Sequence, residues 1–386
     1  MGLFRASALA VVVGTFTVIP AFLVGVLSLQ IRADLGVSLA QAAAGVTVFF
    51  AAGALGTAPL GRLSQRVGAL ESMRTATVIS GLSMLAIAAF ASSLEVLLGL
   101  LVVAGLANAL NQPAINLLMA EEVPLGRQGL AFGVKQSAIP AAILVSGLAL
   151  PLVALPLGWR ATVGICGALA LVVAAVAVTA GGSRHPTAHL PVRTTGPPPS
   201  RELVLLAVGA GLASFGPAAL GAHMVASAVD AGISEAGAGV LVAAASAGSL
   251  ILRVSLGERA DRRADYGFLP VAVLLASGSL GYALIASGEP TPLAIGAVVA
   301  FCLGWGWPGL FNLAVVNRHR AAPASATGVT QSGIYVGASA GPALFGLAVT
   351  QTSYGTAWAV IAVMALAGAA TFFAAGRGLT ARAAVR

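Results

Sequence analysis

A single lysine, Lys135, stands inside a hydrophobic stretch that runs from Leu130 to about Leu152. The chain has 20 basic residues, and all the others are arginines, nearly all of which lie at the edges of apolar runs or between them. An ammonium group at the centre of a bilayer costs roughly 2.5–3.5 kcal/mol on insertion scales, so an intramembrane lysine is a candidate functional residue. Its charge predicts an anionic ligand. The alternative is a lysine whose stem extends to the membrane edge without meeting a substrate.

Amide side chains gather in an earlier apolar stretch, where Asn108, Asn111 and Gln112 share one face at helical spacing. Amides that faced lipid would be costly, so this face should meet protein or water. Gln112 and Lys135 lie nine and eight residues from the charged ends of their stretches, which predicts a similar depth. The amides therefore either bind a substrate beside Lys135 or join neighbouring helices.

Other polar or aromatic residues are expected in the same layer or in the related layer of the second half of the chain. These further candidate substrate contacts are Gln136, Trp305, Trp307, Asn312, Thr330, Gln331 and Tyr335. For the two tryptophans, packing is an equally good interpretation. Pro113 and Pro308 predict kinks near this layer.

The composition indicates a membrane protein, because 58% of the residues are hydrophobic and 8% are charged, against about 25% charged in soluble proteins. A net charge of +8 is explained by arginines scattered in short loops and does not indicate nucleic acid binding. Stretches long enough to cross a bilayer occur at 8–29, 39–60, 74–93, 96–119, 130–152, 161–181, 203–227, 235–255, 268–287, 292–316, 327–350 and 357–376.

Twelve spans place both termini on one side of the membrane. Most arginines fall on that side, including Arg253 near the end of its span, and only Arg32 and Arg160 fall on the other. Basic loop residues stay in the cytoplasm, so both termini are expected to be cytoplasmic and the protein to lie in a bacterial inner membrane. His223 is expected at the outer interface, with proton coupling as the alternative.

The two halves of the chain repeat each other. Residues 34–38 match residues 230–234, and Gly61 to Arg66 match Gly257 to Arg262, both at an offset of 196. The repeat predicts two bundles with the same topology, at 1–181 and 203–386, joined by a proline-rich cytoplasmic linker at 182–202.

These features resemble the major facilitator superfamily, an all-α membrane fold of two six-helix bundles related by pseudo-two-fold symmetry. The family pattern Gly-x-x-x-Asp-Arg matches the loop from Gly257 to Arg262, while Gln65 replaces the acidic residue in the first loop. In the family this loop latches neighbouring helices. The resemblance therefore implies gating roles for Gly61, Arg66, Gly257, Asp261 and Arg262.

The resemblance implies a secondary transporter with a central cavity lined by helices 1, 4, 7 and 10. A small organic or inorganic anion is the favoured substrate, with a coupling ion or counter-substrate left open. The alternatives are proton-coupled efflux of neutral or cationic drugs, and a non-transporting receptor or enzyme. Helix 4 lacks the arginine of the drug–proton antiporters, and no catalytic pair or metal-ligand spacing is present. We expect no cofactor, no nucleic acid partner, and a monomer in the lipid bilayer.

The orientation is testable at Ser183 in the linker. A cysteine placed there should not react with a membrane-impermeant thiol reagent added outside intact cells, because basic segments stay in the cytoplasm. Ready labelling from outside would reverse the predicted topology.

Overall fold

The computed structural model describes residues 3–123, 125–180, 200–262, 267–319 and 323–383, and most of the predicted linker lies outside this part. The first half contains α1 (Leu3–Val26), α2 (Ser28–Leu35), α3 (Leu39–Val67), α4 (Ala69–Phe90), α5 (Leu94–Glu122), η1 (Leu125–Arg127), α6 (Gln128–Gln136), α7 (Ala138–Ala149), η2 (Leu150–Ala154), α8 (Leu155–Leu157) and α9 (Trp159–Ala180). The second half contains α10 (Arg201–Asp230), α11 (Glu235–Asp261), α12 (Leu269–Ile285), α13 (Pro290–Val299), η3 (Ala300–Gly304), α14 (Pro308–Arg318), α15 (Pro323–Gln351) and α16 (Tyr354–Ala383).

All regular secondary structure in the described residues is helical, which confirms the predicted fold class. Eleven helical segments there are long and apolar enough to cross a membrane. The remaining predicted span is α12, a shorter apolar helix of 17 residues. The fifth and tenth spans are each built from several consecutive pieces rather than from one α-helix.

The repeated sequence adopts the same turn in both halves. Gly36 and Gly232 both have positive φ, at 65° and 90°, a conformation that glycine adopts without steric cost. Two residues later, Ser38 and Ser234 cap the N-termini of α3 and α11 by accepting a hydrogen bond from a first-turn amide. The serine and glycine positions therefore explain where these helices begin and why the chain reverses before them.

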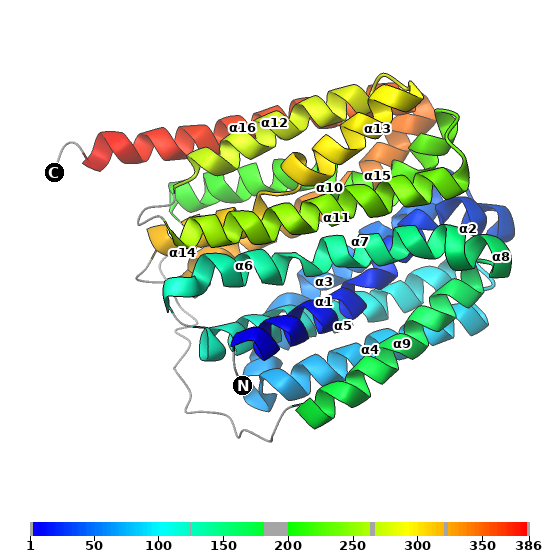
Figure 1. The fold of residues 1–386 in the computed structure, drawn as a ribbon, viewed down its shortest axis with the longest axis horizontal. Coiled ribbons are helices and arrows are strands. Elements are labelled where there is room, and N and C mark those ends of the chain that lie inside the picture. Colours follow the sequence, from blue (N-terminus) through cyan, green and yellow to red (C-terminus); the bar gives the residue numbers. More distant parts are fainter. Residues whose placement is uncertain (1–2, 124, 181–199, 263–266, 320–322, 384–386) are drawn as a thin grey trace.

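The two halves lie side by side, with α11 of the second half beside α6 and α7 of the first (Figure 1). Helix α15 packs against α3 in the same way, and α1 packs against α10. We call the end of the molecule where α1 begins and α16 ends the terminal end, and the other the opposite end (Figure 1). Near the opposite end, Gln30 donates to Glu235 across the halves at 3.3 Å.

Helix breaks differ between the halves. The fifth span breaks at Ser137, between α6 and α7, whereas its repeat partner α15 is unbroken. The tenth span breaks between η3 and α14, and Pro308 begins the new helix. Pro113 instead lies inside the continuous helix α5, so the two prolines predicted to act alike do not.

A close helix crossing near the opposite end gives a test of packing. A side chain at Gly25 of α1 would collide with the main chain of Gly221 in α10, whereas Gly99 of α5 has open space around it. Gly25→Leu should therefore lower stability by about 1–3 kcal/mol through overpacking, and Gly99→Leu should not. Thermal unfolding in detergent measures both, and equal melting temperatures would contradict the crossing.

Candidate functional site

Lys135 lies in the last turn of α6 and is partly buried. Its Nζ donates a hydrogen bond of 2.6 Å to the Oδ1 of Asn116 on α5. No ion pair with a carboxylate is recorded for this amine within the part of the chain that the structure describes. The lysine thus faces another helix of its own half and keeps its positive charge unneutralised.

The amides of α5 form two separate pairings. The Nε2 of Gln112 donates to the Oδ1 of Asn108 at 3.3 Å, one helical turn away. Asn111 is fully buried and donates to the Oγ1 of Thr17 on α1 at 2.8 Å. Asn111 therefore joins two helices, while Gln112 and Asn108 bond to each other within α5.

Two of the candidate aromatic residues lie at the contact between the halves. The ring of Trp305 packs edge-on against Phe22 of α1, with centroids 5.9 Å apart. Tyr335 of α15 approaches Gly53 of α3, where a Cβ would stand 3.6 Å from its ring. Both side chains are buried, so they are placed where relative motion of the halves would move them.

The other candidates lie elsewhere in the second half or make different contacts. Trp307 packs in an aromatic cluster with Phe311 and Phe372, the latter from α16. The hydroxyl of Thr330 donates to main-chain carbonyls of its own helix. Asn312 is buried on α14, whereas Gln136 and Gln331 are partly buried on α6 and α15.

Among the predicted gating residues, Asp261 makes the contact between halves. Its two carboxylate oxygens accept hydrogen bonds from the main-chain amides of Gly129 at 2.6 Å and Leu130 at 2.9 Å. These amides belong to the first turn of α6, where the N–H groups have no acceptor within the helix. The positive end of the helix dipole there also attracts negative charge. Gly257 lies one turn earlier, where a Cβ would stand 2.5 Å from the Gly129 oxygen.

The remaining gating candidates do not cross the interface. Arg262 is exposed and pairs with Glu258 in its own helix at 2.6 Å. Arg66 is exposed in the last turn of α3, and Gly61 lies against Pro113 within the first half. The contact between the halves is therefore asymmetric: Asp261 at the end of α11 contributes a carboxylate, whereas Gln65 occupies the matching position near the end of α3.

Arg253 was expected near the end of its span, but the helix continues past it to Asp261. It is only 2% exposed and lies two turns inside α11. Its guanidinium donates from Nη1 to the carbonyl of Gln136 and from Nη2 to the carbonyl of Trp305. The sequence signal that was available is its position between Leu252 and Val254, inside an apolar run.

His223 was expected at the outer interface, but its side chain meets protein and not its surroundings. The side chain is fully buried in α10. Its Nε2 lies 2.9 Å from the carbonyl oxygen of Pro342, and its ring packs on Phe345 with centroids 4.6 Å apart. The imidazole joins α10 to α15 rather than contacting headgroups.

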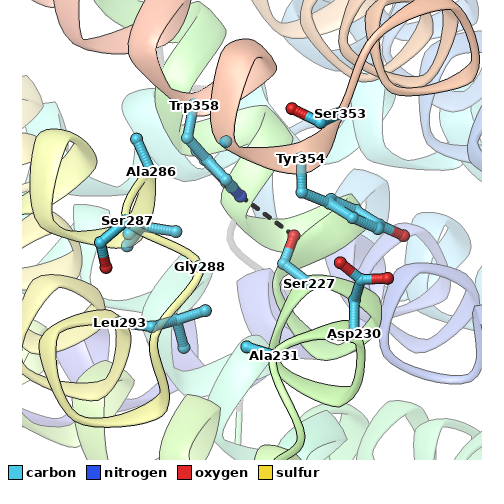
Figure 2. Close-up of a pocket in the computed structure, with 12 residues that line it drawn as sticks. Ser227, Asp230, Ala231, Ala286, Ser287, Gly288, Leu293, Ser353, Tyr354 and Trp358 are labelled. Carbon is cyan, nitrogen blue, oxygen red and sulfur yellow. Dashed lines mark hydrogen bonds between the residues drawn. The ribbon is translucent and has the colours of Figure 1, made fainter.

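A cavity of about 310 Å³ opens at the opposite end, within the second half (Figure 2). Trp358 donates its indole N–H to the Oγ of Ser227 at 3.0 Å on its wall, and Asp230 and Tyr354 lie nearby (Figure 2). None of the candidate substrate contacts lines this cavity. In the described residues, no group of three or more His, Cys, Asp or Glu side chains could hold a metal ion.

Solved structures with the same arrangement of helices are known. A bacterial homolog of the human lysosomal transporter Spinster, in its inward-facing and occupied conformation, matches with a TM-score of 0.72 and 17% identity, covering 97% of this chain and 96% of that one. The inward-facing, unoccupied conformation matches with a TM-score of 0.69 and 16% identity over the same shares. No curated protein sequence matches this chain.

The fold defines a polytopic helical protein with the helix arrangement of these solved structures. The sequence model of the Major Facilitator Superfamily matches residues 7–205. This chain belongs to the Major Facilitator Superfamily. The family and the structural relatives point to a transporter and not to an enzyme.

The asymmetric latch predicts unequal effects of two substitutions. Asp261→Asn should slow turnover several-fold while changing substrate affinity little, because charged hydrogen bonds worth about 1.5–3 kcal/mol are weakened in one conformation. Gln65→Ala, the matched change in the first loop, should be nearly silent. Initial uptake rates in proteoliposomes at low and saturating substrate separate the two parameters, and equal effects would argue against the latch.

Proposed function

We propose that this protein carries a small organic or inorganic anion across a bacterial inner membrane by alternating access. Lys135 supplies the counter-charge, and the amides of α5 supply hydrogen bonds. The protein works as a monomer with both termini in the cytoplasm. A coupling ion or counter-substrate completes the cycle where transport is active.

The observation that carries this proposal is the environment of the Lys135 amine. An amide oxygen of Asn116 orients the ammonium at 2.6 Å but does not neutralise it. A charge of this kind inside a membrane protein is costly, and such residues usually have a functional role. An anion that enters beside Asn116 would gain a charge-assisted hydrogen bond, which is about twice as strong as a neutral one.

Asn108 and Gln112 support the same assignment. Gln112 is only partly buried, so its amide can exchange its bond with Asn108 for one to a ligand. Both residues lie on α5, the helix that also contributes Asn116. Alternating access is supported by the relatives, which were solved in an inward-facing, occupied conformation and an inward-facing, unoccupied one.

Because Lys135 is the only lysine, its amine can be observed alone. Reductive methylation with ¹³C-formaldehyde gives one lysine signal, distinct from that of the N-terminal amine. Titration with benzoate, lactate or inorganic phosphate should shift that signal if an anion binds there. A response to tetraphenylphosphonium and to none of the anions would instead favour efflux of cationic compounds.

Substitution of the lysine gives the corresponding transport prediction. Lys135→Ala should weaken anion affinity about tenfold to a hundredfold, the scale of a lost charged hydrogen bond, and Lys135→Glu should be worse through repulsion. Lys135→Arg should keep the charge but lose the geometry. Uptake and thermal shift with the same anions measure this, with Arg259→Ala, an exposed cation on α11, as the control. A folded Lys135→Ala protein with unchanged anion affinity would refute the proposal.

A further inference from the structure

Arg253 carries a buried charge whose partners are main-chain oxygens. The described ion pairs include no carboxylate for it, and its Nε makes no hydrogen bond. Its guanidinium also lies 5.7 Å from the ring centroid of Trp305, a cation–π distance. A buried guanidinium is costly unless its N–H groups find hydrogen-bond acceptors.

The first acceptor exists because of a proline. In an α-helix the carbonyl of Gln136 would accept from the amide four residues later, but that residue is Pro140, which has no N–H. The helix ends at Gln136, and α7 starts at Ala138. Arg253 thus supplies the donor that Pro140 lacks.

The second acceptor lies at the other helix break. Trp305 follows the π-helical turn η3 and precedes α14, so its carbonyl is outside both helices. Arg253 therefore bonds one break in each half of the molecule. Its repeat counterpart, at the offset of 196, is Thr57, an uncharged residue whose hydroxyl donates to the Gly53 carbonyl of its own helix.

Helix α6 is held by α11 at both of its ends. Asp261 accepts from its first-turn amides, and Arg253 donates to its last carbonyl, so each charge has the sign that complements the helix dipole. Between the two charges, the backbones meet closely: a Cβ on Gly133 would stand 2.6 Å from the Arg253 oxygen. Small residues of this kind permit main-chain contact between helices.

We propose that Arg253 is a positioning residue for transport: by bonding the Gln136 carbonyl, it docks α6 on the second half and thereby fixes the position of Lys135. The role of Lys135 in substrate binding rests on the proposed function. The docking of α6 by Arg253 does not depend on that function. Docking is therefore tested without a substrate.

Hydrogen–deuterium exchange of the full-length protein in detergent measures the docking. Arg253→Gln should speed exchange of the amides of residues 128–136 roughly tenfold, equivalent to about 1.4 kcal/mol, with little change in α3 or α15. Arg259→Gln, an exposed arginine on the same helix, is the matched control. Arg253→Lys keeps a donor and should give a smaller increase, which also serves if Arg253→Gln does not fold.

A proline substitution separates docking from general destabilisation. Pro140→Ala restores an amide that can bond the Gln136 carbonyl within the helix, so Arg253→Gln should then matter less than in the original background. The ¹³C-methyl signal of Lys135 should move in Arg253→Gln and not in Arg259→Gln. Exchange in α6 equal to that of Arg259→Gln, or an increase spread over all helices, would overturn the proposal. So would an effect of Arg253→Gln that is undiminished in the Pro140→Ala background.

If the docking results are as expected but anions leave the Lys135 signal unchanged, the docking role stands and the anion proposal fails. If anions shift that signal but the amides of α6 exchange at the same rate in all variants, the anion proposal stands and the docking role fails.

Discussion

The burial of the Arg253 charge is the constraint on which the centre of this molecule depends. A bilayer offers no water to a guanidinium, so the protein must provide oxygens. Carbonyls within an unbroken helix already accept a bond from the helix backbone, whereas a carbonyl at a helix break is open to a donor from another helix. The structure meets the need with two interrupted helices, and the interruptions in turn depend on Arg253 to satisfy the Gln136 and Trp305 carbonyls.

Much of the fold could be predicted because it follows from local features. Apolar length locates the spans, and the glycine and serine after Asp34 and Asp230 locate two helix starts. The placement of Asp261 at a helix contact follows from the family pattern. The partners of Asp261 could not be predicted in this way, because the amides that it accepts from belong to residues 132 and 131 positions earlier.

The candidate site was less predictable, because its contacts depend on which helix faces meet. Arg253 was predicted near the end of its span, and only its bonds to segments 117 and 52 residues away show that it is buried between helices. The buried His223 likewise bonds a carbonyl 119 residues away. Pro113 and Pro308 occupy repeat positions at an offset of 195, yet only Pro308 begins a helix, so residue type alone does not determine a break.

The docked α6 also sets a condition on alternating access. Opening the terminal end between α6 and α11 would expose the Asp261 carboxylate and separate Arg253 from Gln136. A substrate shifts such an equilibrium only by its different affinities for the two arrangements. Lys135 and Arg253 place two cations near the last turn of α6, and like charges repel. Under the proposed function, an anion at Lys135 relieves that repulsion most when α6 is docked on α11. The carrier with a bound anion therefore favours the docked arrangement, and the empty carrier favours separation of α6 from α11.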